Sequence, residues 1–126
     1  MNRQSAVWAA VADTLLVALF VVIGRRSHAE GLDLGGLWQT AWPFLAALLI
    51  GWLVSLAWRR PLAVWPSGVV IWAMTLVGGM LLRTVSGQGT QLAFVLVAAG
   101  TLALFLLGWR AAVALVARWR SPRAAS

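Results

Sequence analysis

Asp13 has the most unusual setting in this chain, because it interrupts an apolar run at about residues 6–24. In a membrane-spanning helix it would lie about seven residues, or about 10 Å, from the nearer end, where a carboxylate needs a partner or water. The partner must lie at a similar depth in the membrane. Arg110 lies at a similar distance from the matching end of the last apolar run, whereas Arg83 is more than about 10 Å too far along the axis. We therefore expect an Asp13–Arg110 pair that joins the first and last helices.

This pair allows two interpretations. It is either an internal clamp that fixes which helices touch, or a proton- or ion-linked carboxylate in a transport path. The small size of the chain, 126 residues, favours the clamp. If the pair forms, loss of Asp13 alone damages folding more than replacement of both Asp13 and Arg110 by apolar residues.

Two loops carry a second group of polar residues, at about residues 24–31 and 83–90. The planar guanidinium group of arginine and the N–H groups of a glycine-rich backbone both donate hydrogen bonds to phosphate and carboxylate groups. The two loops could therefore together bind a small anion or a lipid headgroup. The candidate residues for this binding site are Arg25, Arg26, His28, Arg83 and Gln88.

The alternative for these loops is structural. Arg25, Arg26 and Arg83 would then extend to the membrane interface, while Glu30 and Asp33 partly neutralise them. Both interpretations stay open at the level of sequence.

The sequence lacks the sets of residues that form common catalytic and metal-binding sites. It has one histidine and no cysteine, so a multi-histidine or thiolate metal site cannot be built. His28 follows the first apolar run, far from Asp13, which argues against a Ser–His–Asp arrangement. Phosphate-loop and dinucleotide motifs are absent from the sequence. We therefore expect no enzymatic activity, no metal and no cofactor.

The elements that position these residues are four long apolar stretches, at about residues 6–24, 37–58, 64–82 and 92–117. A bilayer-spanning helix needs roughly 20 mostly apolar residues. Hydrophobic residues make up 62% of the chain and charged residues 10%, and the mean hydropathy is +0.88. The prediction is an all-α membrane protein: one integral membrane domain over residues 1–126, with four transmembrane helices in an antiparallel bundle.

The arginines also predict the orientation of the bundle. The formal net charge of +7 comes from arginine alone, and these residues gather at helix ends, which favours membrane orientation over nucleic-acid binding. The positive-inside rule places both termini and the 59–66 loop in the cytoplasm, and the 25–36 and 83–91 loops outside, in a multi-pass plasma membrane protein. The arginines on the predicted cytoplasmic side are Arg3, Arg59, Arg60, Arg118, Arg120 and Arg123.

The two halves of the chain resemble each other at an offset of 57 to 58 residues. Because both halves start on the same side of the membrane, they would form a parallel repeat of two helical hairpins, related by a pseudo-twofold axis. The matching motifs are Arg25-x4-Glu30-Gly31 with Arg83-x4-Gln88-Gly89, Gly51-Trp52 with Gly108-Trp109, and Trp58-Arg59-Arg60-Pro61 with Trp119-Arg120-Ser121-Pro122.

Small residues recur at helical spacing in the second and third apolar stretches. Such rows let helix backbones approach closely, so they predict bundle packing rather than a pore lining. The rows are Ala47, Gly51 and Ser55 in the second stretch, and Gly68, Trp72, Thr75, Gly79 and Arg83 in the third.

Over about residues 7–110, the chain resembles the membrane-protein family called domain of unknown function 3054. The resemblance implies a small, mainly prokaryotic protein of four membrane helices, and it implies no activity, ligand or catalytic residue. It rests on Asp13, Gly24-Arg25-Arg26-Ser27-His28, Trp42-Pro43-Phe44, Gly51-Trp52, Trp65-Pro66-x-Gly68, Trp72 and Gly78-Gly79-Met80-Leu81-Leu82-Arg83.

Two functions are compatible with these observations. The first is a binding or accessory role in the bilayer, in which the arginine loops contact lipid headgroups or a partner membrane protein. The second is a subunit of an oligomeric transporter or channel, which would use Asp13 in an ion- or proton-linked path and would require a homo-oligomer. Water at Asp13 would favour the second function, and a dry, paired carboxylate the first.

Overall fold

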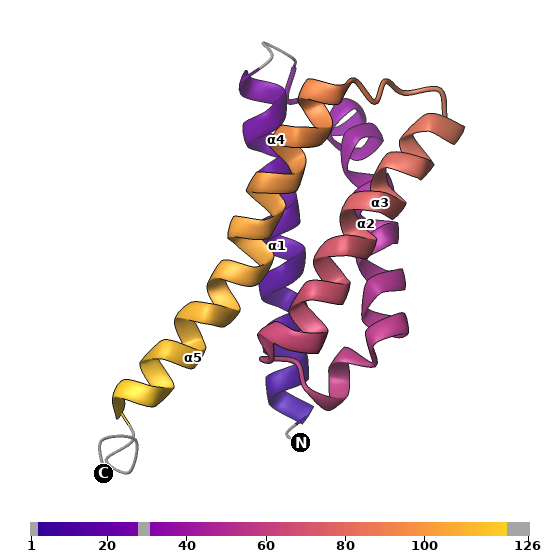
Figure 1. Ribbon diagram of the computed structural model, residues 1–126. Coiled ribbons are helices and arrows are strands. Elements are labelled where there is room, and N and C mark those ends of the chain that lie inside the picture. The colour runs from indigo at the N-terminus through magenta and orange to yellow at the C-terminus, as the bar shows by residue number, and fades with distance from the viewer. Residues whose placement is uncertain (1–2, 28–30, 121–126) are drawn as a thin grey trace.

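The computed structural model describes residues 3–27 and 31–120, and this part of the chain is helical apart from short turns. In Figure 1 the spans run in alternating directions, and residues 3 and 120 lie at the same end of the bundle. We call this the terminal end, and the end that carries Arg25 and Arg83 the distal end. The α-helices are α1 (Arg3–Ser27), α2 (Leu34–Ser55), α3 (Val69–Val85), α4 (Leu92–Leu102) and α5 (Gly108–Arg120). The short elements are the 3-10 turn η1 (Ala57–Arg59) and the π-helical segments η2 (Val64–Gly68) and η3 (Ala103–Leu107).

Four helical segments of the described chain are long and apolar enough to cross a bilayer. The protein is therefore an all-α membrane protein with four spanning helices, as predicted. The segments are Arg3–Arg26, Leu34–Ser55, Val64–Val85 and Leu92–Arg120, the last made of α4, η3 and α5.

The helix ends differ from the predicted ones where local backbone geometry decides them. The second helix ends at Ser55 rather than residue 58, because Leu56 adopts a left-handed conformation (φ 53°) and its N–H turns back to the carbonyls of Trp52 and Leu53. The third helix continues to Val85 instead of residue 82. The apolar pattern located the spans, but it carried no information on where the backbone leaves the helix.

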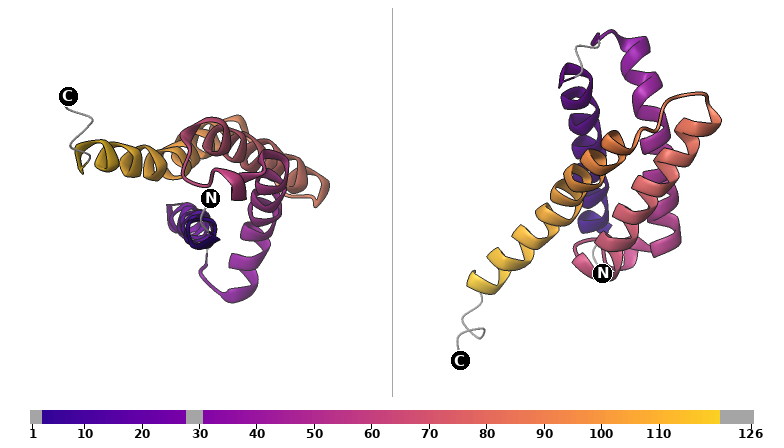
Figure 2. Two further views of the ribbon diagram at one scale, coloured as in Figure 1. Left: turned by 90° about the horizontal axis from the view of Figure 1, so that it is seen from below. Right: turned by 45° about the horizontal axis from the view of Figure 1, so that its top comes forward.

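The last span is longer than the hydrocarbon core of a bilayer is thick. Its 29 residues extend for about 43 Å, against a hydrocarbon core of about 30 Å. Figures 1 and 2 show that α5 diverges from the other helices, and residues 111–120 are all exposed. Its last turn carries Arg118 and Arg120, which can reach the membrane interface.

The helices α2 and α3 form the most extensive contact of the bundle, and glycines permit it. A Cβ on Gly51 would lie 3.2 Å from the Cα of Ile71, and one on Gly78 would lie 2.9 Å from the Cβ of Ala47. Backbone therefore packs directly on the neighbouring helix, which is how membrane helices associate without a hydrophobic driving force between them. Of the predicted rows of small residues, Gly51 and Gly79 lie at this contact, whereas Gly68 faces Leu107 and Arg110 of the last span.

The repeat predicted from the sequence is visible in the helix boundaries. The helices α2 and α4 begin at Leu34 and Leu92, which lie 58 residues apart. The N-cap residues of α2 and α4, Asp33 and Gln91, have nearly the same backbone angles (φ −65°, ψ 154° and φ −64°, ψ 148°). At the distal end, the second helix of each hairpin therefore begins at an equivalent position and with the same backbone conformation.

Candidate functional site: a distal pocket and a buried charge centre

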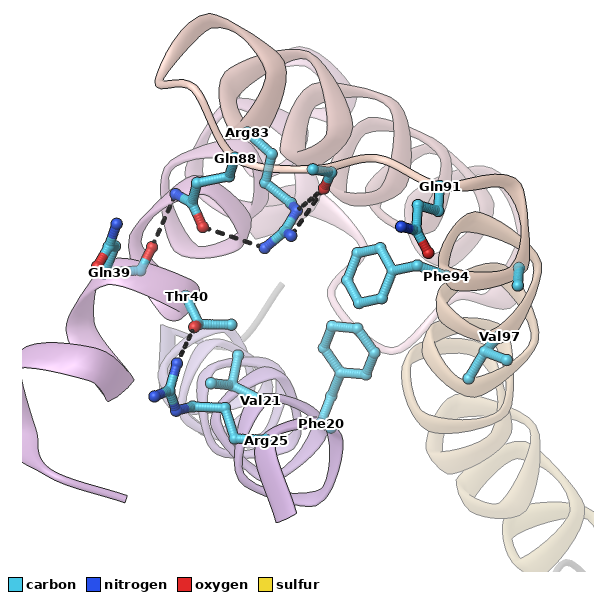
Figure 3. Close-up of a pocket in the computed structure, with 13 residues that line it drawn as sticks. Phe20, Val21, Arg25, Gln39, Thr40, Arg83, Gln88, Gln91, Phe94 and Val97 are labelled. Atoms are coloured by element: carbon cyan, nitrogen blue, oxygen red, sulfur yellow. Dashed lines mark hydrogen bonds between the residues drawn. The ribbon is translucent and has the colours of Figure 1, made fainter. Parts of the chain in front are cut away.

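A cavity of about 490 Å³ opens between the helices at the distal end (Figure 3). All four spans contribute to its wall. Its apolar residues include Phe20, Val21, Phe94 and Val97, and its polar residues are Arg25, Gln39, Thr40, Arg83, Gln88 and Gln91.

Arg25, in the last turn of α1, is held at this pocket by neighbouring polar groups. Its Nε donates to the carbonyl of Gly31 (2.5 Å) and its Nη1 to the hydroxyl of Thr40 (2.8 Å). Gly36 leaves room for the guanidinium, since a Cβ at that position would come within 2.5 Å of the arginine Nη2. The side chain is thus fixed between α1 and the start of α2.

Arg83, near the end of α3, is held in the corresponding way. Its Nε and Nη2 donate to the carbonyl of Gly89 (3.0 and 2.7 Å), and its Nη1 donates to Oε1 of Gln88 (3.2 Å). Its Cζ lies 4.6 Å from the centroid of the Phe94 ring, a cation–π arrangement. Gln88 in turn donates to the carbonyl of Gln39 (3.0 Å), which links the second hairpin to the first.

The two arginine sites are equivalent in the repeat. In each, an arginine near the end of a helix donates from Nε to the carbonyl of a glycine six residues later. Gly36 and Phe94, also 58 residues apart, both lie against the guanidinium of their own half. The sequence motif shared by the two loops therefore encodes the same hydrogen bond twice.

The structure brings together three of the five residues predicted to form this site. Arg25, Arg83 and Gln88 line one pocket. Arg26 lies on α1 but is not part of the pocket wall, because consecutive residues of a helix point about 100° apart. His28 lies outside the described residues.

An aromatic layer closes the pocket toward the membrane centre. Phe20 and Phe94 line the pocket, and the ring of Phe44 packs edge-on against both, with centroid distances of 5.1 and 6.4 Å. Phe44 is fully buried. Apolar side chains therefore separate the distal pocket from the charged residues nearer the terminal end.

Those charged residues are Asp13 and Arg110, which form a buried ion pair. Arg110 Nη2 lies 2.7 Å from Asp13 Oδ2 and Nη1 lies 2.8 Å from Oδ1, so the contact is bidentate. Both side chains are 0% exposed. Arg110 also donates to the carbonyls of Pro61 (2.9 Å) and Leu106 (3.0 Å). Asp13 and Arg110 were predicted to pair because they lie at similar depths in the membrane, and the structure places them in direct contact.

Two tryptophans complete this centre, and sequence reasoning missed them. Trp52 Nε1 donates to Asp13 Oδ2 and Trp109 Nε1 donates to Oδ1, both at 2.9 Å. Each carboxylate oxygen therefore accepts one indole N–H and one guanidinium N–H. The spacing of the matched motifs Gly51-Trp52 and Gly108-Trp109 could have placed an indole from each half at the depth of Asp13, but it does not tell which way the indole points.

These indole bonds make a prediction. Trp52→Phe and Trp109→Phe each remove one donor to a buried carboxylate, and each should lower the free energy of unfolding by about 1–3 kcal/mol. Unfolding by SDS in mixed micelles measures this loss. Trp119→Phe is the matched control, since Trp119 is 78% exposed. If the three variants were equally stable, the indole bonds would contribute nothing.

Within the described residues, no group of three or more His, Cys, Asp or Glu side chains could hold a metal ion.

Comparison with known proteins finds one family that the chain matches. No curated protein and no solved structure matches the chain. A family model described as protein of unknown function (DUF3054) matches residues 10–113, which include Asp13, Arg110 and both arginine sites. The match covers most of the sequence, so the chain belongs to the DUF3054 family.

Proposed function

We propose that this protein is a non-enzymatic binding protein of the membrane whose distal pocket holds the anionic headgroup of a membrane lipid. The observation that carries the proposal is the pocket itself, in which Arg25 and Arg83 share a cavity with Phe20 and Phe94 (Figure 3). A phospholipid needs this combination, because its phosphate is charged and its acyl chains are apolar.

The electrostatics of the pocket support an anionic ligand. Its described wall contains two arginines and no acidic side chain. Glycine carbonyls and the Thr40 hydroxyl are among the groups that orient the two guanidinium groups. Guanidinium forks fixed before binding lose little side-chain entropy when a phosphate arrives.

The depth of the apolar residues supports a lipid rather than a soluble anion. Phe20 lies five residues before Arg25 on α1, or about 7.5 Å deeper along the axis. Val97 is 62% exposed on α4 and stands beside the pocket, facing where acyl chains lie. A headgroup held by the arginines would therefore lead its chains onto apolar surface. With the termini in the cytoplasm, as the arginine bias favours, the pocket would face the outer leaflet.

The same observations weigh against ion- or proton-linked transport through Asp13. Both oxygens of this carboxylate already accept hydrogen bonds, and its side chain is fully buried. The Phe20–Phe44–Phe94 layer separates it from the distal pocket. These features suit the clamp interpretation of the Asp13–Arg110 pair.

Lipid retention tests the proposed function. We expect the protein, reconstituted in phosphatidylcholine nanodiscs containing phosphatidylglycerol, to retain bound phosphatidylglycerol when released into native mass spectrometry. Arg25→Gln and Arg83→Gln should each reduce retention about tenfold or more, the effect of losing a charged hydrogen bond of about 1.5–3 kcal/mol.

Arg26→Gln is the matched control, because it removes an equal charge one residue away, outside the pocket. Equal retention by all three variants would show that the anionic lipid is attracted only by overall charge, and the proposed binding site would be wrong.

A further inference from the structure

We infer that the ligand of the distal pocket carries two phosphate groups, one for each arginine site, as in diphosphatidylglycerol, in which one glycerol joins two phosphatidyl groups. This inference rests on the proposed function and narrows it to one class of lipid.

The first support is the duplication of the arginine site. Arg25 and Arg83 are equivalent residues of the two hairpins, each fixed by an Nε bond to a glycine carbonyl six residues later. They stand on opposite sides of the cavity, Arg25 from α1 and Arg83 from α3 (Figure 3). A single phosphate would use one of two equivalent sites, whereas a lipid with two phosphates would use both.

The second support is the size of the cavity. Its volume of about 490 Å³ falls in the range of sites that enclose whole small molecules, roughly 300–1,000 Å³. This space is several times what one phosphate group needs, and it accommodates two such groups with a short linker.

The third support is the way the two halves are tied together across the pocket. Gln88, which orients Arg83, donates to the carbonyl of Gln39 in the other hairpin. Gln39 and Thr40 are neighbours on α2, and Thr40 orients Arg25. The two guanidinium groups are thus held by one connected frame, so their spacing is set before a ligand binds. A ligand whose two charges are covalently joined gains most from such a frame, because its second contact is intramolecular.

The test compares two lipids at equal phosphate concentration. Wild-type protein in phosphatidylcholine nanodiscs is titrated with diphosphatidylglycerol or with phosphatidylglycerol, and bound lipid is counted by native mass spectrometry. We expect at least about tenfold tighter binding of diphosphatidylglycerol, with one molecule per chain, since joining two ligands commonly raises affinity by about 10²–10⁴.

The arginine variants then separate this inference from the proposed function. Arg25→Gln and Arg83→Gln should each reduce the preference to near unity, and Arg26→Gln should keep it. Arg25→Lys and Arg83→Lys retain the charge but lose the fork, so they should fall between, which guards against a loss caused by misfolding.

Two results would overturn the inference in distinguishable ways. If wild-type protein binds both lipids equally per phosphate, and the arginine variants weaken both, the pocket holds a single anionic headgroup: the two-phosphate inference fails and the proposed function stands. If neither lipid is retained by the wild type, the proposed function fails as well.

Discussion

Asp13→Ala is expected to destabilise the protein by about 3–5 kcal/mol, the usual cost of leaving a buried charge without its partner. Arg110 would keep its bonds to the carbonyls of Pro61 and Leu106 but would lose both contacts to the carboxylate. The indoles of Trp52 and Trp109 would lose their acceptor at the same time. Unfolding by SDS in mixed micelles measures the loss.

The double variant Asp13→Leu/Arg110→Met is the informative control. Replacing a buried ion pair by apolar residues of similar size is often neutral or stabilising, whereas removing one partner is costly. We expect the double variant to be about 2 kcal/mol more stable than Asp13→Ala, with the remaining loss due to the two indoles. If the single and double variants lost the same stability, the Asp13–Arg110 contact would not act as a clamp.

Gly79→Ala is the second change with a large expected effect. A Cβ at this position would lie 2.5 Å from Cδ1 of Phe44, closer than side-chain carbons approach. The Phe44 ring is fully buried and packs against Phe20 and Phe94, so it cannot yield without moving the floor of the distal pocket. Overpacking of this kind costs about 1–3 kcal/mol.

Gly100→Ala is the matched control for this prediction. Gly100 is an exposed glycine of α4, and a Cβ there would meet no described side chain within 4 Å. Alanine at this position should therefore be neutral or stabilising by up to about 1 kcal/mol. Adding Phe44→Leu to Gly79→Ala should recover part of the lost stability by making room. A Gly79→Ala protein as stable as Gly100→Ala would contradict the close packing of α2 on α3.

The sequence predicted those features that depend on position along one axis. Apolar length located the four spans, and depth in the membrane paired Asp13 with Arg110, because both properties can be counted along the chain. The spacing of the Arg25 and Arg83 motifs likewise predicted two equivalent loops, and the repeated Nε–carbonyl bond gives the physical reason for that spacing.

The direction in which a side chain points from its helix could not be predicted from the sequence. Arg25 and Arg26 are indistinguishable in composition, yet only Arg25 lines the pocket, since their side chains point in different directions. The same ambiguity hid Trp52 as a partner of Asp13, because an indole in an apolar run can equally face lipid. The left-handed Leu56 that ends α2 has no sequence signal, as leucine is an uncommon residue there.

Thiol accessibility is the most direct test of a distal binding pocket closed off from a dry charge centre. The chain has no cysteine, so single cysteines at Ala93, Thr75 and Ala10 can be labelled in membranes with a charged thiol reagent. Ala93 is exposed and lines the pocket, Thr75 is fully buried, and Ala10 lies one turn from Asp13 on α1. We expect labelling at Ala93 alone, and protection of Ala93 by added anionic lipid but not by phosphatidylcholine. Labelling at Thr75 or Ala10, or labelling at Ala93 that anionic lipid leaves unchanged, would contradict this arrangement.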